Sequence, residues 1–235
     1  MNILVLKPCC LGDVLMTTPL LATLRAAYPD ARIDYAVGDW ARPALITNPD
    51  IDDVLPLFNP FASIARRLAQ AISSALTLRW RRYDLAFIPD RRPLTMMVAY
   101  LAGVPRRFGI RGGGRAVLLT DSVADETRSH EVDIFLKLAE AAGLRKHIAR
   151  EMKYVPTQAS LERALETLHA EGFEELPFLV PLFPGGQSAL RARLSPQAVA
   201  ARAVRPAGQP PDREARRGRH PPRWRGGAGA LLPDP

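Results

Sequence analysis

Cysteine is scarce in this 235-residue chain, and the only two, Cys9 and Cys10, are neighbours in the sequence. A bridge between them would close no long loop, so the disulfide framework of a small secreted domain is excluded. This scarcity predicts a reducing compartment, and we expect a cytoplasmic protein. No apolar run approaches ~20 residues, and the N-terminus lacks the basic-then-apolar order of a signal peptide. The sequence therefore predicts neither secretion nor a membrane span.

Acidic residues are scarce toward the end of the chain, and this explains the formal net charge of +8. Residues 1–187 carry 22 basic and 21 acidic side chains, whereas residues 188–235 carry 10 arginines and 3 acids. A basic stretch of this kind is a candidate for binding RNA or anionic lipid. However, Trp224 is its only aromatic residue, and no recognised nucleic-acid module is present. We therefore expect no nucleic-acid partner.

The same stretch lacks Lys, Ile, Phe, Tyr and Met, and is dominated by Arg, Ala, Pro and Gly. Such a composition buries too little apolar area to offset the entropy lost on ordering, so residues 202–235 are predicted to form a disordered tail. These four residue types also dominate when GC-rich DNA is translated out of frame. A frameshift is therefore a second explanation, which an intact reading frame on both sides of the codon for residue 187 would contradict.

Short runs rich in Val, Ile and Leu alternate with longer segments of helical period, which is typical of parallel strands covered by helices on both faces. The fold class is therefore α/β. We expect strands at residues 3–6, 32–37, 53–57, 84–88 and 116–119. We expect helices at residues 13–28, 40–47, 61–80, 93–103, 130–143 and 157–171. Pro19 should kink the first helix or split off its first turn, and Gly143 suits the left-handed position after the fifth.

Two glycine-containing segments are candidate ligand loops. Residues 108–115 include three adjacent glycines and predict either a mobile loop that closes over a ligand or a simple hairpin or connecting loop with solvated arginines. Farther on, a predicted buried strand at residues 177–183 is followed by the Gly-rich turn 184–188. A strand followed by such a turn indicates an anion site when a helix comes next, because the helix amides then point at the anion.

One carboxylate, Asp13, lies where the first predicted strand gives way to the first helix. The carboxyl ends of parallel strands and the amides of a following helix both face the crevice in which α/β proteins bind ligands. An aspartate there is either an ordinary helix cap or an ionised base whose charge the helix N-terminus favours. The position of Asp13 alone slightly favours the helix cap over the catalytic base.

Several other charged residues allow two interpretations. Lys7 and the pairs Arg66–Arg67 and Arg91–Arg92 either face an anionic ligand or are simply solvated. His130 is expected to cap a helix or lie at the surface rather than to act as a base. No His, Cys or Asp cluster has metal-site spacing, so we expect no metal. The first strand is not followed by Gly-x-Gly-x-x-Gly, which argues against a nicotinamide oxidoreductase, and we expect no cofactor.

The run from Val5 to Leu21, with its motif Leu11-Gly12-Asp13-Val14, closely resembles the start of the ADP-heptose:lipopolysaccharide heptosyltransferases, glycosyltransferase family 9. Shorter segments resemble the same family, and they lie at residues 28–34, 48–54, 83–86, 130–133 and 143–144. The resemblance implies a GT-B architecture, in which two Rossmann-like domains face each other across a cleft. The N-terminal domain would hold the acceptor, and the C-terminal domain would hold the nucleotide sugar.

The resemblance also implies a reaction: transfer of heptose from ADP-heptose to the inner core of lipopolysaccharide, with inversion and without a metal. Asp13 matches the family's candidate general base, which takes the proton of the acceptor hydroxyl. Lys7, Cys9, Cys10 and Gly12 would line the acceptor site, and the two cysteines stand where the family usually has small hydroxyl residues. Peripheral association with the cytoplasmic face of the inner membrane is implied as well.

The donor side departs from the family pattern. Gly185, Gly186 and Ser188 match a phosphate-binding turn, but the Lys-x-Trp-Pro pattern expected next is replaced by residues 191–196. Arg193 is therefore the candidate that replaces the lysine on the donor diphosphate.

The predicted organisation has three parts. Residues 1–155 form the Rossmann-like acceptor-binding domain, residues 156–201 a linker helix and the start of an incomplete donor-binding domain, and residues 202–235 the tail. Loss of part of the donor domain by truncation or frameshift should remove most of the rate of heptose transfer, because binding energy from the nucleotide positions the reacting carbon. The alternative function is non-catalytic binding of an anionic saccharide or a partner protein.

Overall fold

The computed structural model describes residues 1–111, 117–126, 129–144 and 149–172. Residues 1–164 form one compact unit and residues 165–235 are grouped as a second. The predicted buried strand at 177–183, the Gly-rich turn after it and the tail all lie outside the described residues.

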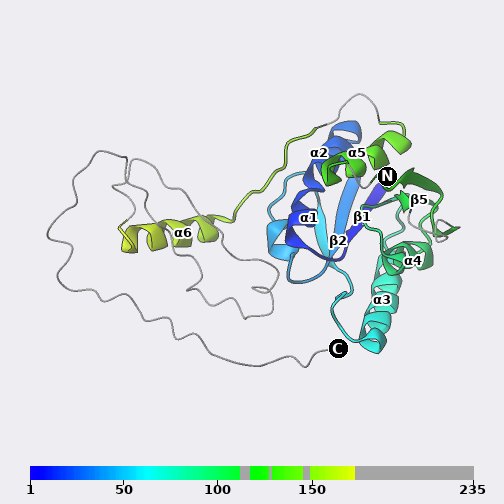
Figure 1. Ribbon diagram of the computed structural model, residues 1–235, viewed down its shortest axis with the longest axis horizontal. Coiled ribbons are helices and arrows are strands. Elements are labelled where there is room, and N and C mark those ends of the chain that lie inside the picture. Colours follow the sequence, from blue (N-terminus) through cyan, green and yellow to red (C-terminus); the bar gives the residue numbers. More distant parts are fainter. Residues whose placement is uncertain (112–116, 127–128, 145–148, 173–235) are drawn as a thin grey trace, which may run out of the picture. The chain divides into compact units, whose positions relative to one another are not determined.

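A single parallel sheet forms the centre of the first unit, with strand order β3-β2-β1-β4-β5-β6 (Figure 1). The strands are β1 Asn2–Lys7, β2 Arg32–Val37, β3 Asp53–Pro56, β4 Leu85–Ile88, β5 Arg106–Arg111 and β6 Asp121–Ala124. Strand order reverses between β1 and β4, which lie side by side. In doubly wound sheets, ligands bind beyond the carboxyl ends of the strands at this switch point. The predicted α/β class is confirmed.

The described helices follow the prediction closely, with one exception. They are α1 Leu11–Leu15, α2 Thr18–Ala27, α3 Ile64–Arg79, α4 Pro93–Leu101, α5 Glu131–Ala141 and α6 Gln158–Ala170. The predicted helix at 40–47 is wrong, because only a 3-10 turn, η1 Arg42–Ala44, forms there. Pro43 lies inside this segment, and Pro49 disfavours helical backbone at the residue before it.

Pro19 separates two helices, as predicted. It is the second residue of α2, where an N–H would have no helical partner to lose. Later in the chain, Gly143 follows α5 with a φ of 92°, which confirms the expected left-handed position.

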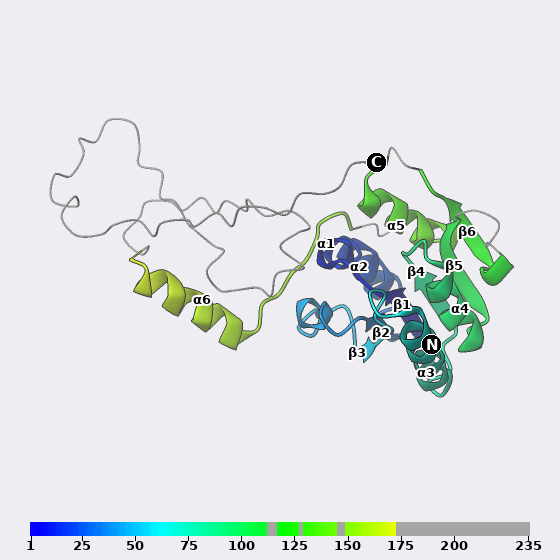
Figure 2. The ribbon, with the colours of Figure 1, turned by 60° about the horizontal axis from the view of Figure 1, so that its bottom comes forward.

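Helices cover both faces of the sheet, and Figure 2 shows α2 and α5 on one side and α3 and α4 on the other. Side chains of β1 alternate between the two layers, because successive residues of a strand point to opposite faces. Ile3 and Val5 pack with α2 and α5, whereas Leu4 and Leu6 pack with α3 and α4. Among the described residues, no helix combines the length and apolar character needed to cross a membrane.

The fifth strand corrects two predictions. The strand expected at 116–119 is wrong, and the loop expected at 108–115 is wrong at its start, because β5 ends at Arg111 and β6 begins at Asp121. Phe108 of β5 stacks on Phe87 of β4 with ring centroids 5.0 Å apart, and the guanidinium of Arg106 lies 4.9 Å from the Phe108 ring. Two arginines of this strand, Arg106 and Arg107, place their charges over aromatic rings, which accommodates them in a strand.

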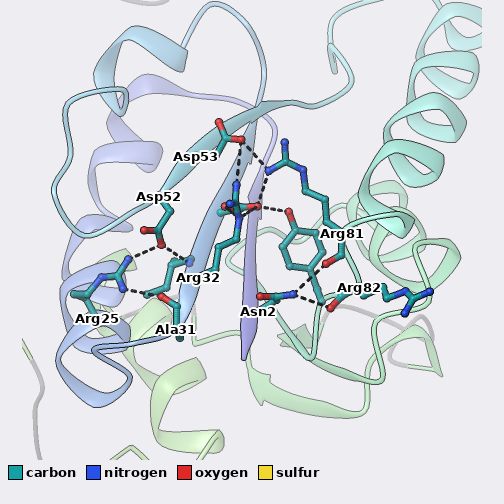
Figure 3. A network of polar contacts seen from close by, with 11 residues as sticks. Asn2, Arg25, Ala31, Arg32, Asp52, Asp53, Arg81 and Arg82 are labelled. Carbon is teal, nitrogen blue, oxygen red and sulfur yellow. Dashed lines mark hydrogen bonds and ion pairs between the residues drawn. The ribbon is translucent and has the colours of Figure 1, made fainter.

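A network of polar contacts, which includes Arg32, Asp53 and Arg81, joins β2 to the segment before β4 (Figure 3). Asp34 is fully buried and accepts hydrogen bonds from Tyr83 Oη at 2.6 Å, Arg81 Nη1 at 2.9 Å and Arg32 Nε at 3.0 Å. Burial and then the Asp34 bond raise the pKa of Tyr83 well above its usual range. Burial alone would lower the pKa of Arg81, but hydrogen bonds to Asp53 and Asp34 raise it.

We expect Asp34→Asn to lower the free energy of unfolding by about 3 kcal/mol, because it leaves buried donors unpaired. Asp53→Asn is the matched control, since Asp53 also accepts from Arg81, at 2.8 Å, but its side chain is 35% exposed. It should cost less than about 1 kcal/mol. Urea denaturation followed by circular dichroism measures both, and equal losses would contradict the central role of Asp34.

Candidate functional site

The turn between β1 and α1 lies at the switch point of the sheet and is held in an unusual backbone conformation. Cys10, the N-cap of α1, has φ 73° and ψ 99°, in a region that residues with side chains rarely adopt. Such conformations cost on the order of 1–3 kcal/mol and cluster at functional sites. Gly38, just after β2, donates its N–H to the Pro8 carbonyl at 3.2 Å. A Cβ at Gly38 would lie 2.6 Å from that oxygen, so only glycine fits there.

Asp13 is the third residue of α1 and not its cap. The N-cap position belongs to Cys10, and no side-chain cap hydrogen bond is made there. The capping interpretation is therefore wrong. The Asp13 side chain is 38% exposed, and its Oδ2 lies 3.2 Å from the Nζ of Lys7. This carboxylate is thus both reachable from solvent and held by a cation.

Lys7 is buried at the carboxyl end of β1, with 2% of its surface exposed, so the solvated interpretation is wrong. Its Nζ lies 5.2 Å from the centroid of the Phe135 ring of α5, a cation–π contact. A buried ammonium is costly unless it is paired. Within the described part of the chain, Asp13 is the one carboxylate that forms an ion pair with Lys7. The two residues therefore stabilise each other across the turn.

The remaining acceptor-site candidates differ in accessibility. Cys9 is fully buried and its Sγ lies 3.0 Å from that of Cys10, which is only partly buried. Burial and then this hydrogen bond raise the pKa of the Cys9 thiol to about 12, although Arg92 opposes the shift. Gly12 is exposed, and a Cβ built there would meet nothing within 4 Å. The structure thus brings all four candidates and Asp13 onto one turn, with Cys10 and Gly12 at the surface.

A second carboxylate at this edge of the sheet was not among the predicted site residues. Asp90 lies two residues after the end of β4, is 2% exposed, and accepts hydrogen bonds from Thr95 Oγ1 at 2.5 Å and from Arg92 Nη1 at 3.0 Å. Burial alone would lower the pKa of Arg92, but the charge of Asp90 contributes to raising it. An aspartate two residues after the predicted strand 84–88 was the available signal, since the carboxyl ends of neighbouring parallel strands share one edge.

Arg91 and His130 have structural partners. Arg91 donates to both oxygens of Asp125, each at 2.8 Å, and to Glu131 at 2.9 and 3.0 Å. These bonds raise the pKa of Arg91. They tie the loop after β4 to the ends of β6 and α5, so neither the solvated nor the ligand-facing interpretation describes Arg91. His130 is the N-cap of α5 and its Nδ1 accepts from Val132 N–H at 3.2 Å, which confirms the capping prediction.

The predicted donor-site residues Gly185, Gly186, Ser188 and Arg193 lie outside the described residues. Within the described ranges, no group of three or more His, Cys, Asp or Glu side chains is arranged to hold a metal ion.

Comparison with solved structures gives the class of protein that this fold belongs to. A glycosyltransferase family 9 structure from Veillonella parvula superposes with a TM-score of 0.68 over 74% of this chain and 50% of the other, at 20% identity. ADP-heptose lipopolysaccharide heptosyltransferase II of Escherichia coli superposes with a TM-score of 0.59 over 72% of this chain and 50% of the other, at 26% identity. The described domain has the α/β fold found in these GT-B glycosyltransferases.

Sequence comparison points to the same family. The chain is 36% identical over 121 residues to lipopolysaccharide heptosyltransferase 2 of E. coli, an alignment that covers 52% of this chain and 34% of that protein. No family model matches. The resemblance to the ADP-heptose:lipopolysaccharide heptosyltransferases is confirmed. The matched part of the chain spans about a third of the length of this curated relative.

We expect iodoacetamide to modify Cys10 well before Cys9 in the folded protein at about pH 8, because only a thiolate reacts and Cys9 is buried with a raised pKa. Peptide mass spectrometry at increasing times locates the label. In denaturant the two thiols should react at similar rates. Faster labelling of Cys9 in the native protein would contradict the described turn.

Proposed function

We propose that this domain is the acceptor half of a heptosyltransferase, which transfers heptose from ADP-heptose to a sugar of the lipopolysaccharide inner core with inversion. One observation carries the proposal. Asp13 lies at the switch point of the sheet, partly exposed and ion-paired with the buried Lys7, within a chain similar to heptosyltransferases. Its reaction site would be on the cytoplasmic face of the inner membrane.

Asp13 acts as the general base in this proposal. As the acceptor hydroxyl attacks the anomeric carbon, Asp13 accepts its proton, a C–O bond forms, and the bond to the ADP oxygen breaks on the opposite face of the sugar. ADP departs with the electron pair, and the configuration inverts. Lys7 is the positioning residue: its ammonium lies 3.2 Å from the carboxylate and fixes its orientation.

The surface beside Asp13 supports an acceptor site. Gly12 is exposed with open space where a side chain would be, and its fold position does not require glycine, since its φ lies outside the left-handed region. The missing side chain leaves room for a sugar to approach Asp13. Cys10 offers a partly exposed thiol on the same turn. Because Cys9 is buried, it shapes this turn from behind.

The donor part of the proposal rests on the family resemblance. Gly185 and Gly186 would let the backbone approach the diphosphate of ADP-heptose, with Ser188 and Arg193 supplying a hydroxyl and a positive charge. The proposed chemistry involves no metal.

Asp13→Asn is expected to lower heptose transfer by about 10²–10⁴-fold, because an amide cannot take the proton. Purified full-length chain is incubated with ADP-heptose and a heptose-deficient core acceptor, and product is measured by mass spectrometry. Asp53→Asn is the control, since its carboxylate is similarly exposed and also paired with a cation. It should retain wild-type turnover.

Equal turnover by the wild type and Asp13→Asn would contradict the catalytic proposal. Robust turnover by the wild-type chain would contradict both the incomplete donor domain and the non-catalytic saccharide-binding alternative.

A further inference from the structure

Helix α3 exposes a continuous ridge of apolar side chains. Residues four apart on a helix are neighbours, and a row of large hydrophobic residues follows this spacing from the first residue of α3 to the residue after its last. All are between 44% and 86% exposed: Ile64, Leu68, Ile72, Leu76 and Trp80. Phe61, just before the helix, is 72% exposed. Contiguous exposed apolar surface of this kind marks an interaction site rather than ordinary surface variation.

The side of α3 next to this ridge already has its partner. Ala71, Ala75 and Leu78 are buried against the sheet layer that α3 shares with α4. The exposed ridge is therefore additional to the face that stabilises the fold. Helix α4, which packs against α3, exposes Met97, Tyr100 and Leu101 as well.

The segment that carries the ridge is positive and has no acidic residue. Between Val54 and Tyr83 there are five arginines and no Asp, Glu or Lys. Arg81 is held by Asp34 and Asp53, but within the described residues Arg66 and Arg82 form no ion pair, and both are exposed. Apolar residues beside uncompensated arginines match the composition of helices that lie in the interface of anionic membranes.

A hollow at the C-terminal end of the ridge extends this match. It has a volume of about 470 Å³ and is lined by Arg79, Trp80 and Arg82, among others. Asp84 also lines it, but one of its carboxylate oxygens accepts the Asn2 N–H at 2.7 Å. Two arginines beside an 86% exposed tryptophan fit a phosphate headgroup, because Trp prefers the headgroup level and Arg pairs with phosphate.

We infer that the outer face of α3, defined as the ridge together with Arg66, Arg79 and Arg82, binds the surface of an anionic lipid bilayer. The apolar ridge enters the headgroup boundary, and the arginines pair with lipid phosphates. This inference rests on the proposed location at the membrane face and names the surface that binds there, but it does not depend on the catalytic role of Asp13, because none of these residues takes part in the reaction. The charge of the segment favours lipid over a second copy of the chain, since two such faces would repel each other.

Trp80 permits a test that separates this face from the basic tail. The chain has three tryptophans, so Trp40→Phe/Trp224→Phe leaves Trp80 as the single tryptophan in the full chain. Vesicles of phosphatidylcholine alone are compared with vesicles in which about a third of the lipid is phosphatidylglycerol. We expect the chain to pellet with the anionic vesicles and its emission to shift to the blue. Raising the salt should weaken binding.

Matched variants assign the binding to α3. Ile72→Gln/Leu76→Gln should weaken vesicle binding by about tenfold or more, whereas Ile46→Gln/Leu161→Gln, at residues of similar exposure elsewhere, should not. Likewise, Arg66→Gln/Arg82→Gln should weaken binding severalfold more than the control Arg42→Gln/Arg111→Gln. Circular dichroism checks that each variant is folded.

Three results would overturn the inference. The first is pelleting without any change in Trp80 emission, which would assign lipid binding to the tail. The second is equal binding by the α3 variants and their controls. The third is an absence of binding to the anionic vesicles. A dimer in sedimentation that Ile72→Gln/Leu76→Gln dissociates would then make the ridge an interface between copies.

Discussion

The ammonium group of Lys7 is buried at the end of the central strand, where it is stable only with a counter-charge close by. Asp13 supplies that charge from the first turn of α1, and the Phe135 ring of α5 covers another side of the ammonium. The chain between the two residues must therefore turn sharply, and Cys10 adopts a left-handed conformation there. The pairing fixes where the carboxylate lies and keeps one side of it open to solvent.

Several ion-paired side chains of the domain lie in or next to strands, where they join segments that the apolar layers do not. Arg91 and the Asp90–Arg92 pair hold the loop after β4 at the carboxyl edge. Asp34 joins β2 to the segment before β4 through its ion pair with Arg81. The two apolar layers stabilise the sheet, and these ion pairs set the positions of the loops around it. A rigid edge of this kind is what a catalytic carboxylate needs.

Local signals in the sequence predicted most of the fold. Pro19 marked the break between α1 and α2, and the apolar run of β1 marked a strand buried on both faces. Signals that depend on tertiary packing were missed: β5 contains three arginines and a glycine, yet it pairs with β4 and β6 and packs Phe108 on Phe87. The sequence singled out Asp13, but its partner could not be inferred, since a lone basic residue after a strand, such as Lys7, is more often solvated.

The central claim is that the turn around Lys7 and Asp13 binds the acceptor. The most direct test is amide NMR of the isotope-labelled chain during titration with a heptose-deficient core oligosaccharide. The account predicts shifts concentrated at Cys10, Gly12 and Asp13, with Asn2 and Arg32, at the opposite ends of their strands, unchanged. Saturable binding that shifts Asn2 and Arg32 while leaving the turn unchanged would contradict it.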